Sequence, residues 1–381
     1  MSEEPSRPAQ VRSQTADQKG HTGHPNRRSL QLPMAKRTKN LVGLDIDATG
    51  IVAASVAVNG RLRVEQAAVT PLEPGIIRDG EVADVDGLAD ALRALYRANK
   101  GLDKRVRVGL ANQKIVVRVI DLPYLEDAKE IDAAVRFHAQ DQLPMPLEHA
   151  VVDYQRLDVV TDETGRRQRV LLVAARREMV ERVLAALRSA GLKPEGVDLS
   201  AFAMVRALHR TGAEDDEHVL YLAIGGLTNL AVARGTGCTF ARASGSGVEA
   251  LAVELAERSQ LTLEHAHGWL AHVGVEAPVE LIEGDAEIVA NARQILLDGV
   301  RRIAADVRSS LDFHRMQDDA TSVSRAVLTG PVTAIPGFAN ALASELGMPV
   351  EEGVVDGAPA GIEAGRVTVA AGLALHEAPA S

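Results

Sequence analysis

The stretch LVGLDIDATGIVAASVAV, residues 41–58, decides the fold, because its pattern returns as VLYLAIGGLTNLAVA at residues 219–233. In both places an apolar run leads into a short turn of small residues, and a second apolar run follows. Two such runs joined by a tight turn are typical of a β-hairpin. The sequence therefore predicts two related hairpins, one in each half of the chain.

The two copies differ at the residues that could carry chemistry. The first copy has the acids Asp45 and Asp47 in its strand and turn. The second copy has Gly225 and Gly226 in its turn. Ala223 of the second copy stands at the position that the acid Asp45 occupies in the first. The repeated pattern thus indicates a shared fold more strongly than a shared reaction.

Length and composition predict a large two-lobed protein. The chain has 381 residues, 46% of them hydrophobic, which is enough to bury a sizeable core in more than one lobe. No apolar run reaches the roughly 18 residues of a spanning helix, and we expect no signal peptide. The single cysteine, Cys238, cannot form an internal disulfide, which is compatible with a reducing compartment.

Several functional classes are disfavoured by the sequence. A net charge of −10 and an aromatic content of 3% argue against a nucleic-acid partner, which requires a basic face and stacking platforms. The chain contains no Gly-x-x-x-x-Gly-Lys-Ser/Thr loop and no Gly-x-Ser-x-Gly elbow. P-loop and α/β-hydrolase chemistry are therefore excluded.

The first 39 residues form a region of their own. They are rich in Ser, Gln, Pro and Gly, with eight basic residues against three acidic ones, and show no hydrophobic periodicity. Such a composition predicts a disordered basic tail. The tail could be attracted to anionic lipid headgroups, or it could be a solvated extension without a partner.

Helices and strands alternate along the rest of the chain, which predicts an α/β fold with mixed sheets. Helices are expected at 84–99, 127–141, 177–190, 200–208, 248–259, 264–273, 287–316, 339–346 and 364–375. Strands are expected at 105–110, 114–122, 150–157, 170–174, 193–199, 325–331 and 347–351. The polar run at 212–217 is the predicted boundary between lobes.

Other candidate sites have two interpretations each. His265, His267 and His272 could bind a metal or could line a solvent-facing helix surface, and Cys238 is expected to be a strand residue rather than a nucleophile. The run SGSG at 244–247 could cradle a phosphate or could be a plain turn before a helix. Pro144 and Pro146 fix an extended segment, either for packing or to frame a peptide groove.

The chain resembles the PilM family of type IV pilus assembly, which is itself similar to the division protein FtsA. The resemblance covers about residues 41 to 376 and is carried by VRVIDLP (117–123), FHAQDQLPMPL (137–147), VDY (152–154), LVAARRE (172–178), AGLKP (190–194), LTGP (328–331) and IPGF (335–338). It implies an actin-like (ribonuclease H-like) two-lobe α/β fold with an inserted subdomain of the SHS2 kind found in FtsA as subdomain 1C.

The resemblance also implies a division of the chain. The first lobe core (1A) is expected at 40–74 and 166–213, and the inserted subdomain (1C-like) at 75–165. The second lobe core (2A) is expected at 214–247 and 325–381, and its helical subdomain (2B) at 248–324. The tail at 1–39 precedes them.

In actin-like ATPases the two hairpin turns hold the phosphates of ATP and an acid positions Mg²⁺. Carried onto this sequence, Asp45 is the metal residue, and no catalytic residue is assigned. The expected nucleotide-binding residues are Asp45, Asp47, Thr49, Gly225, Gly226, Thr228, Gly330 and Gly337.

This sequence departs from the family pattern at the expected nucleotide site. Asp47 replaces a turn glycine, Ala223 replaces the second acid and Pro331 replaces a second glycine, while His267 and Leu270 align with an acid and a lysine near the adenosine. A carboxylate close to a phosphate repels it unless a cation lies between them. Weak or lost ATP binding and little hydrolysis are therefore expected.

The implied function is a cytoplasmic scaffold at the inner face of the membrane. In the family the cytoplasmic N-terminal tail of the membrane protein PilN binds beside the inserted subdomain, so a PilN-like partner is expected here, with other pilus components and without nucleic acid. One alternative is an active ATPase or sugar kinase, which would need the residues that Asp47 and Ala223 replace. The other is an FtsA-like division protein, which would need a membrane-binding helix that residues 373–381 do not provide.

Overall fold

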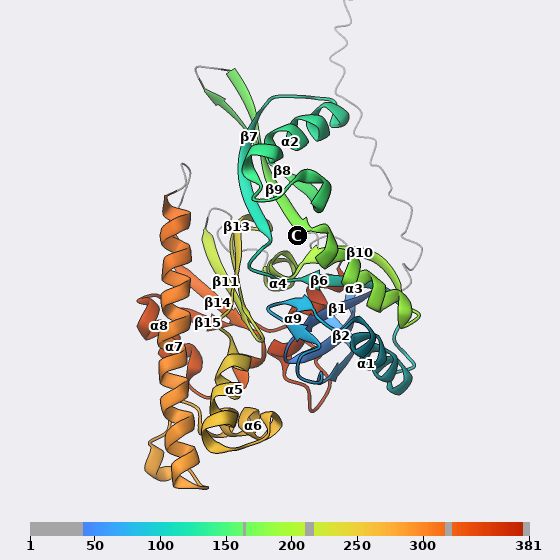
Figure 1. The fold of residues 1–381 in the computed structure, drawn as a ribbon. Coiled ribbons are helices and arrows are strands. Elements are labelled where there is room, and N and C mark those ends of the chain that lie inside the picture. Colours follow the sequence, from blue (N-terminus) through green and yellow to red (C-terminus); the bar gives the residue numbers. More distant parts are fainter. Residues whose placement is uncertain (1–40, 163–164, 210–216, 317–321, 376–381) are drawn as a thin grey trace, which may run out of the picture. The chain divides into compact units, whose positions relative to one another are not determined.

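A computed structural model describes residues 41–162, 165–209, 217–316 and 322–375 (Figure 1). The predicted basic tail and most of the predicted boundary at 212–217 lie outside the described residues. Every predicted helix is confirmed to within a residue at either end.

The first hairpin belongs to a five-stranded mixed sheet. Its strands β1 and β2 pair antiparallel, β2 pairs antiparallel with β3, and β6 and β10 are added parallel on the other side of β1. The order is β10-β6-β1-β2-β3. The bounds are β1 Val42–Asp47, β2 Gly50–Val58, β3 Leu62–Thr70, β6 Arg105–Leu110 and β10 Lys193–Leu199.

The second hairpin belongs to a sheet with the same design. Its order is β13-β12-β11-β14-β15, with β11, β12 and β13 antiparallel and β14 and β15 parallel. The bounds are β11 His218–Ile224, β12 Thr228–Arg234, β13 Gly237–Ser244, β14 Arg325–Thr329 and β15 Val350–Glu352. Each strand thus has a counterpart in the first sheet, and the predicted repeat of the hairpin extends to a whole lobe.

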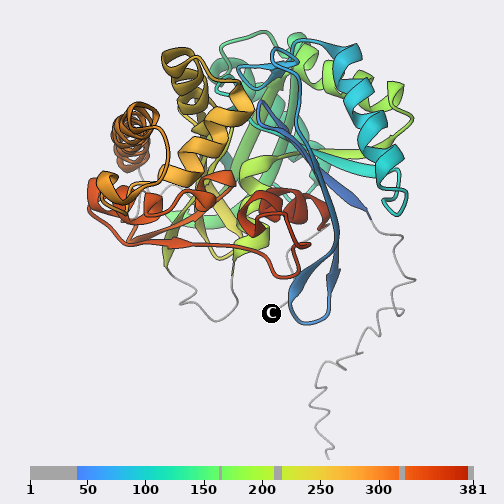
Figure 2. The ribbon, with the colours of Figure 1, turned by 90° about the horizontal axis from the view of Figure 1, so that it is seen from below.

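Helices cover both sheets, and those of the two lobes lie on different sides in Figure 2, where α1 (teal) and α7 (orange) are far apart. The helix α1 begins after Asp84, whose carboxylate accepts a hydrogen bond from the N–H of Gly87, and Asp285 caps α7 in the same way. The helices are α1 Val85–Ala98, α3 Arg177–Ser189, α4 Ser200–Leu208, α5 Val248–Ser259, α6 Leu263–Val273, α7 Ala286–Arg315, α8 Phe338–Leu346 and α9 Ala364–Ala374. The short elements are β4 Ile77–Arg78, β5 Glu81–Val82, η2 Val279–Leu281 and η3 Pro331–Ala334.

Two helices, α4 and α9, occupy the centre of the described structure. They pack on each other, α9 also packs on β1 and β2, and α4 packs on β11 and β12. The approach is close: a Cβ atom added to Gly372 of α9 would lie 1.9 Å from the carbonyl oxygen of Ala203 in α4. A Cβ on Gly43 of β1 would lie equally close to the Ala370 carbonyl oxygen. Glycine is needed at both crossings because the backbones themselves are in contact.

A third, three-stranded sheet in the order β7-β9-β8 is inserted between β6 and α3. The helix α2 covers it through Ile131, Val135 and Ala139, which belong to one apolar cluster with residues of β7 and β9. The guanidinium of Arg177, at the start of α3, donates hydrogen bonds to the carbonyls of Glu148 and Ala150 and so ties this unit to the first lobe. The bounds are β7 Val116–Pro123, α2 Ala128–Gln142, η1 Leu147–His149, β8 Ala150–Asp162 and β9 Gly165–Arg176.

The predicted range 75–165 for the inserted subdomain contains elements of three sheets, the small pair β4-β5, the first-lobe sheet and the three-stranded sheet. β6 pairs with β1 in the first-lobe sheet, and residues of α1 belong to the first-lobe core. β9, most of which lies beyond residue 165, pairs with β7 and β8. The apolar alternation of β6 identifies a strand, but it does not indicate which sheet that strand joins.

Candidate functional site

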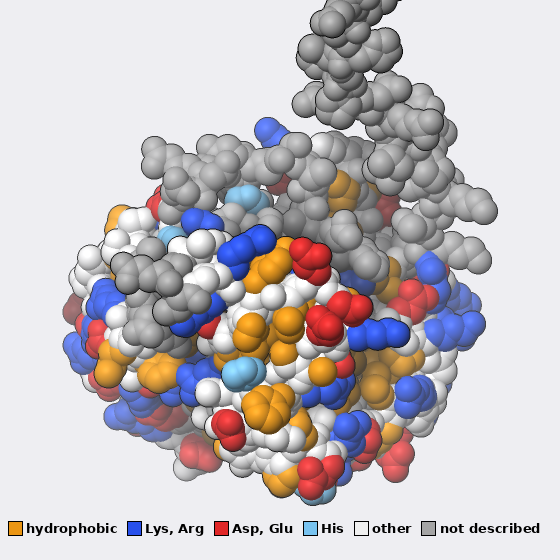
Figure 3. Space-filling model, turned by 90° about the horizontal axis from the view of Figure 1, so that it is seen from above, with side chains coloured by type: hydrophobic (Ala, Val, Ile, Leu, Met, Phe, Trp, Pro, Cys, Tyr) orange, Lys and Arg blue, Asp and Glu red, His pale blue; other side chains and the backbone are white. Residues whose placement is uncertain are grey.

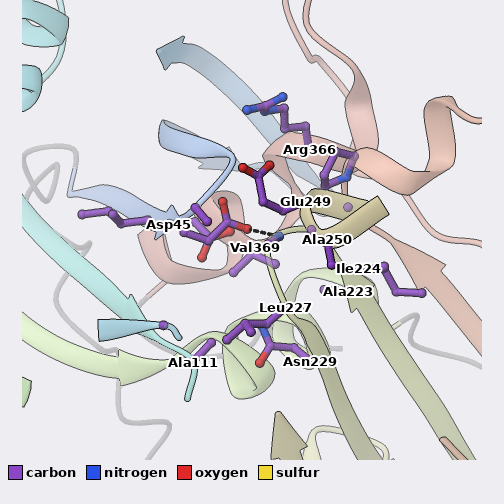
Figure 4. Close-up of a pocket in the computed structure, with 18 of the residues that line it drawn as sticks. Asp45, Ala111, Ala223, Ile224, Leu227, Asn229, Glu249, Ala250, Arg366 and Val369 are labelled. Carbon is purple, nitrogen blue, oxygen red and sulfur yellow. Dashed lines mark hydrogen bonds between the residues drawn. The ribbon is translucent and has the colours of Figure 1, made fainter. Parts of the chain in front are cut away.

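A cavity of about 210 Å³ lies where the turns of the two hairpins face each other. Asp45 and Asp47 line it from the first lobe, and Gly225, Gly226 and Gly330 line it from the second. Figure 4 shows Asp45, Glu249 and Arg366 toward one side of this cavity and Ala111, Leu227 and Asn229 toward the other. The structure therefore brings together five of the residues that the sequence singled out.

The carboxylate of Asp47 bridges the two turns. Its Oδ2 accepts a hydrogen bond of 2.7 Å from the backbone N–H of Gly226. Its Oδ1 accepts two more within the first turn, from the N–H of Thr49 at 2.8 Å and from the Thr49 hydroxyl at 2.5 Å. The guanidinium of Arg366 in α9 donates a hydrogen bond of 2.9 Å to the carbonyl oxygen of Thr49. This bond connects the first turn to α9.

The second turn needs glycine because the first turn comes so close. A Cβ on Gly225 would lie 2.7 Å from Oδ2 of Asp47, and one on Gly226 would lie 3.0 Å from the backbone nitrogen of Ala48. The N–H of Gly225 donates to the Leu227 carbonyl at 3.0 Å, which closes the turn. The Gly225 carbonyl accepts from the N–H of Val248, the first residue of α5, at 2.8 Å.

Asp45 lies two residues before Asp47 in β1, and its pKa is raised. Burial and the neighbouring charge of Asp47 raise the pKa of Asp45 to about 7, although a hydrogen bond from the Ser200 hydroxyl at 3.2 Å and the charge of Arg366 act in the opposite direction. Near neutral pH the carboxyl is therefore about half protonated. A protonated Asp45 is a poor ligand for Mg²⁺, because cations of this kind prefer ionised carboxylates.

This pKa predicts a pH-dependent stability that Asp45→Asn should remove. The folded state holds the proton more tightly than the unfolded chain, whose carboxyl has the ordinary value of 3.8. The stabilising contribution is thus complete below about pH 4 and is lost as the pH rises through about 7. By urea denaturation at about pH 8, Asp45→Asn should be at least about 1 kcal/mol more stable relative to wild type than it is at about pH 4. The exposed Asp158→Asn is the control, and a difference that does not change with pH would mean that folding does not shift the pKa of Asp45.

The remaining predicted residues do not all reach the cavity. Thr49 does not line the cavity, but its hydroxyl donates a hydrogen bond to Asp47, which does. Thr228 is buried, and its hydroxyl donates to the Ser246 carbonyl. Gly337 precedes α8 and lies against Glu276, away from the residues that line the cavity. Ala223 and Pro331, at which the sequence was expected to depart from the family pattern, both line it.

Glu249 and Arg366 line the cavity and were missed in the sequence. Glu249 lies in the first turn of α5, and its Oε2 is 2.9 Å from Nε2 of His267 in α6. Arg366 lies in α9, far from both hairpins along the chain. No local pattern marks either residue, because both reach the site only through the packing of helices.

The histidines of α6, the SGSG run and Cys238, which the sequence offered as other candidate sites, have structural roles. His265 bonds the Thr262 hydroxyl at 2.8 Å and His272 bonds the Glu283 carbonyl at 2.9 Å. The hydroxyls of Ser244 and Ser246, in the SGSG run, both donate to Asp306 of α7. Cys238 is buried in β13, and burial raises its pKa to about 12, so its thiol is not a nucleophile at neutral pH. Within the described ranges no three His, Cys, Asp or Glu side chains are grouped to hold a metal ion.

The cavity does not fit a magnesium nucleotide in this arrangement. Both N–H groups of the glycine turn are engaged, that of Gly225 within the turn and that of Gly226 with Asp47. The carboxylates of Asp47 and Glu249 face the space that phosphates would need, and Arg366 already binds Thr49. The volume is also below the roughly 300 to 1,000 Å³ of usual ligand pockets.

Comparisons with known proteins identify the fold and the family. A solved structure described as the PilM-PilN type IV pilus biogenesis complex matches with a TM-score of 0.73 and 28% identity, covering 88% of this chain and 97% of that one. The ethanolamine utilization protein EutJ from Carboxydothermus hydrogenoformans matches with a TM-score of 0.52 and 16% identity, covering 88% of this chain and 89% of that one. These matches confirm the predicted actin-like two-lobe fold.

In the parts of the chain that the structure describes, no helix combines the length and apolar character needed to cross a membrane. The family model described as "Type IV pilus assembly protein PilM" matches residues 43–358, which include both lobes and the inserted sheet. The chain therefore belongs to the PilM family of type IV pilus assembly proteins.

Proposed function

We propose that this protein is a cytoplasmic scaffold of type IV pilus assembly that binds the cytoplasmic N-terminal segment of a PilN-like inner-membrane protein. The observation that carries the proposal is the match to a PilM–PilN complex across 88% of this chain, with the family model spanning both lobes and the insertion. The protein would then be held at the inner face of the membrane through its partner.

The inserted subdomain, for which we propose the bounds Val116–Arg176, and the adjoining first lobe are the proposed docking region. Phe137 of α2 is 67% exposed and Val151 of β8 is 37% exposed, although most apolar side chains of this unit are buried. Pro144 and Pro146 are exposed in the segment between α2 and β8. Figure 3 views the molecule from the end at which Figure 1 places α2 and the three-stranded sheet, and it shows hydrophobic side chains among charged ones there. Apolar anchors beside an extended segment suit the binding of an extended peptide.

The test is a titration of a synthetic peptide that copies the N-terminal segment of the cognate PilN-like protein. We expect a dissociation constant of about 1 μM or tighter by calorimetry, and protection of residues 116–176 from amide exchange. Phe137→Ser should weaken binding by about tenfold, because it removes an exposed anchor. Leu281→Ser is the matched control, since Leu281 is 76% exposed on the second lobe.

Two outcomes would contradict this placement. The first is protection limited to the second lobe, residues 218–375. The second is equal weakening by Phe137→Ser and Leu281→Ser. If the calorimeter detects no binding, the proposal that a PilN-like protein is the partner is wrong.

Nucleotide binding is proposed to be weak or lost, and the protein to act without catalysis. The support is the contact between Asp47 and the Gly226 N–H, together with Ala223 in place of a second-lobe acid. An active ATPase would need an acid near Ala223 to orient the attacking water, and a sugar kinase would need one to accept the proton of the attacking sugar hydroxyl. ATP turnover by the purified wild-type protein should therefore stay at the level of a blank reaction.

A further inference from the structure

The glycine turn of the second lobe has the features of an anion seat. It packs against the N-terminus of α5, a helix of 12 residues, because the Gly225 carbonyl accepts a hydrogen bond of 2.8 Å from the N–H of Val248. It also presents a backbone N–H from Gly226 toward the first lobe. Backbone N–H groups at a glycine turn favour negative charge, and a helix N-terminus beside them adds to this preference, because the partial positive charges of the peptide units converge there. The group that occupies this seat is the Asp47 carboxylate, at 2.7 Å.

Asp47 is held rigidly on its own side. Two hydrogen bonds from Thr49 fix Oδ1, which leaves Oδ2 pointing to Gly226, and Arg366 fixes Thr49 in turn. The contact to Gly226 joins residues 179 positions apart, from the first hairpin to the second. A hydrogen bond to an ionised carboxylate is about twice as strong as one between neutral groups. The two turns already stand at the distance that this bond requires.

We infer that Asp47 is a built-in replacement for an anionic ligand, and that it fastens the two lobes together at their hairpin turns. The carboxylate takes the seat that a phosphate group would fill, so the lobes are held in this arrangement without one. A phosphate-bearing ligand binds at the Gly226 turn only by displacing Asp47. This inference concerns closure of the lobes and does not depend on the pilus partner.

The first test is amide exchange of Asp47→Ala, which removes the carboxylate without adding the backbone freedom of glycine. Exchange of the amides in segments 47–50 and 224–228 should become about tenfold faster, because about 1.4 kcal/mol of local closing energy corresponds to a factor of ten. Segments in α1 and α7 should be unchanged. Asp158→Ala, which alters an exposed acid of β8, is the control. Equal exchange in Asp47→Ala and the wild type at both segments would overturn the inference.

The second test is rescue by inorganic pyrophosphate, compared with sodium chloride at the same ionic strength. In Asp47→Ala, millimolar pyrophosphate should restore slow exchange at 224–228, whereas the wild type should not respond. Exchange that stays fast with pyrophosphate would show that the turn is not an anion seat. If Asp47→Ala does not fold, Thr49→Val serves instead, since it removes one anchor of Oδ1 and should speed exchange at the same two segments to a smaller extent. Exchange at wild-type rates in Thr49→Val would then overturn the inference.

Discussion

Asp47→Gly is expected to bind Mg-ATP at least about tenfold more tightly than the wild type, a gain of roughly 1.4 kcal/mol or more. The substitution removes a negative charge that faces the space for phosphates, and it frees the N–H of Gly226, which Asp47 now occupies at 2.7 Å. It also introduces the glycine that the resemblance to actin-like ATPases implies for this turn. Turnover should not return, because Ala223 still replaces the second-lobe acid.

Fluorescent ATP titrated with and without Mg²⁺ against the wild type, Asp47→Gly and Asp47→Gly/Ala223→Asp measures this effect. Glu249→Gln is a useful control, because it removes a different carboxylate from the same cavity and leaves the Gly226 contact intact. Tight, Mg-dependent binding by the wild type would contradict the interpretation, since it would mean that Asp47 helps to hold the cation.

Gly372→Ala should be among the most damaging single-methyl changes in the chain. The added Cβ would lie 1.9 Å from the Ala203 carbonyl oxygen and 2.5 Å from its carbonyl carbon, so the backbones of α4 and α9 would have to separate. Both helices pack between the two sheets, and any separation is therefore transmitted to both lobes. We expect a loss of more than about 4 kcal/mol in the free energy of unfolding, or no folded protein.

The matched control is Gly268→Ala in α6. This glycine also lies in a helix, but nothing is within 4 Å of the Cβ that would be added. Alanine is the better helix former by about 1 kcal/mol, so this variant should be as stable as the wild type or more so by chemical denaturation. A Gly372→Ala protein with wild-type stability would show that α4 and α9 do not meet at this crossing.

The sequence predicted the lobes well because they depend on local patterns. The two hairpins carry apolar runs joined by turns of small residues, and the outer helices such as α1 and α7 have an apolar stripe. The strand β3, Leu62–Thr70, was not expected. It lies at the edge of its sheet with Arg63, Glu65 and Gln66 exposed, so its composition resembles that of a surface loop.

The site was predicted only in part, for a different physical reason. Asp45, Asp47 and the glycines could be found because they belong to the hairpins themselves. The contact between Asp47 and Gly226 could not, because it depends on how closely the two lobes approach. Glu249 and Arg366 likewise reach the cavity from helices whose positions no local pattern specifies.

The position of α9 has a consequence for how the protein is made. Arg366 bonds a residue 317 positions earlier in the chain, and α9 covers β1 and β2, the earliest strands of the described residues. Val52 and Ala54 of β2 pack against α9 in the folded protein. Until α9 has left the ribosome, the apolar face that these residues form is therefore exposed. The N-terminal lobe therefore cannot complete its core during synthesis, and the nascent chain exposes apolar strands that chaperones bind. Premature termination before α9 should yield aggregated protein rather than a stable first lobe.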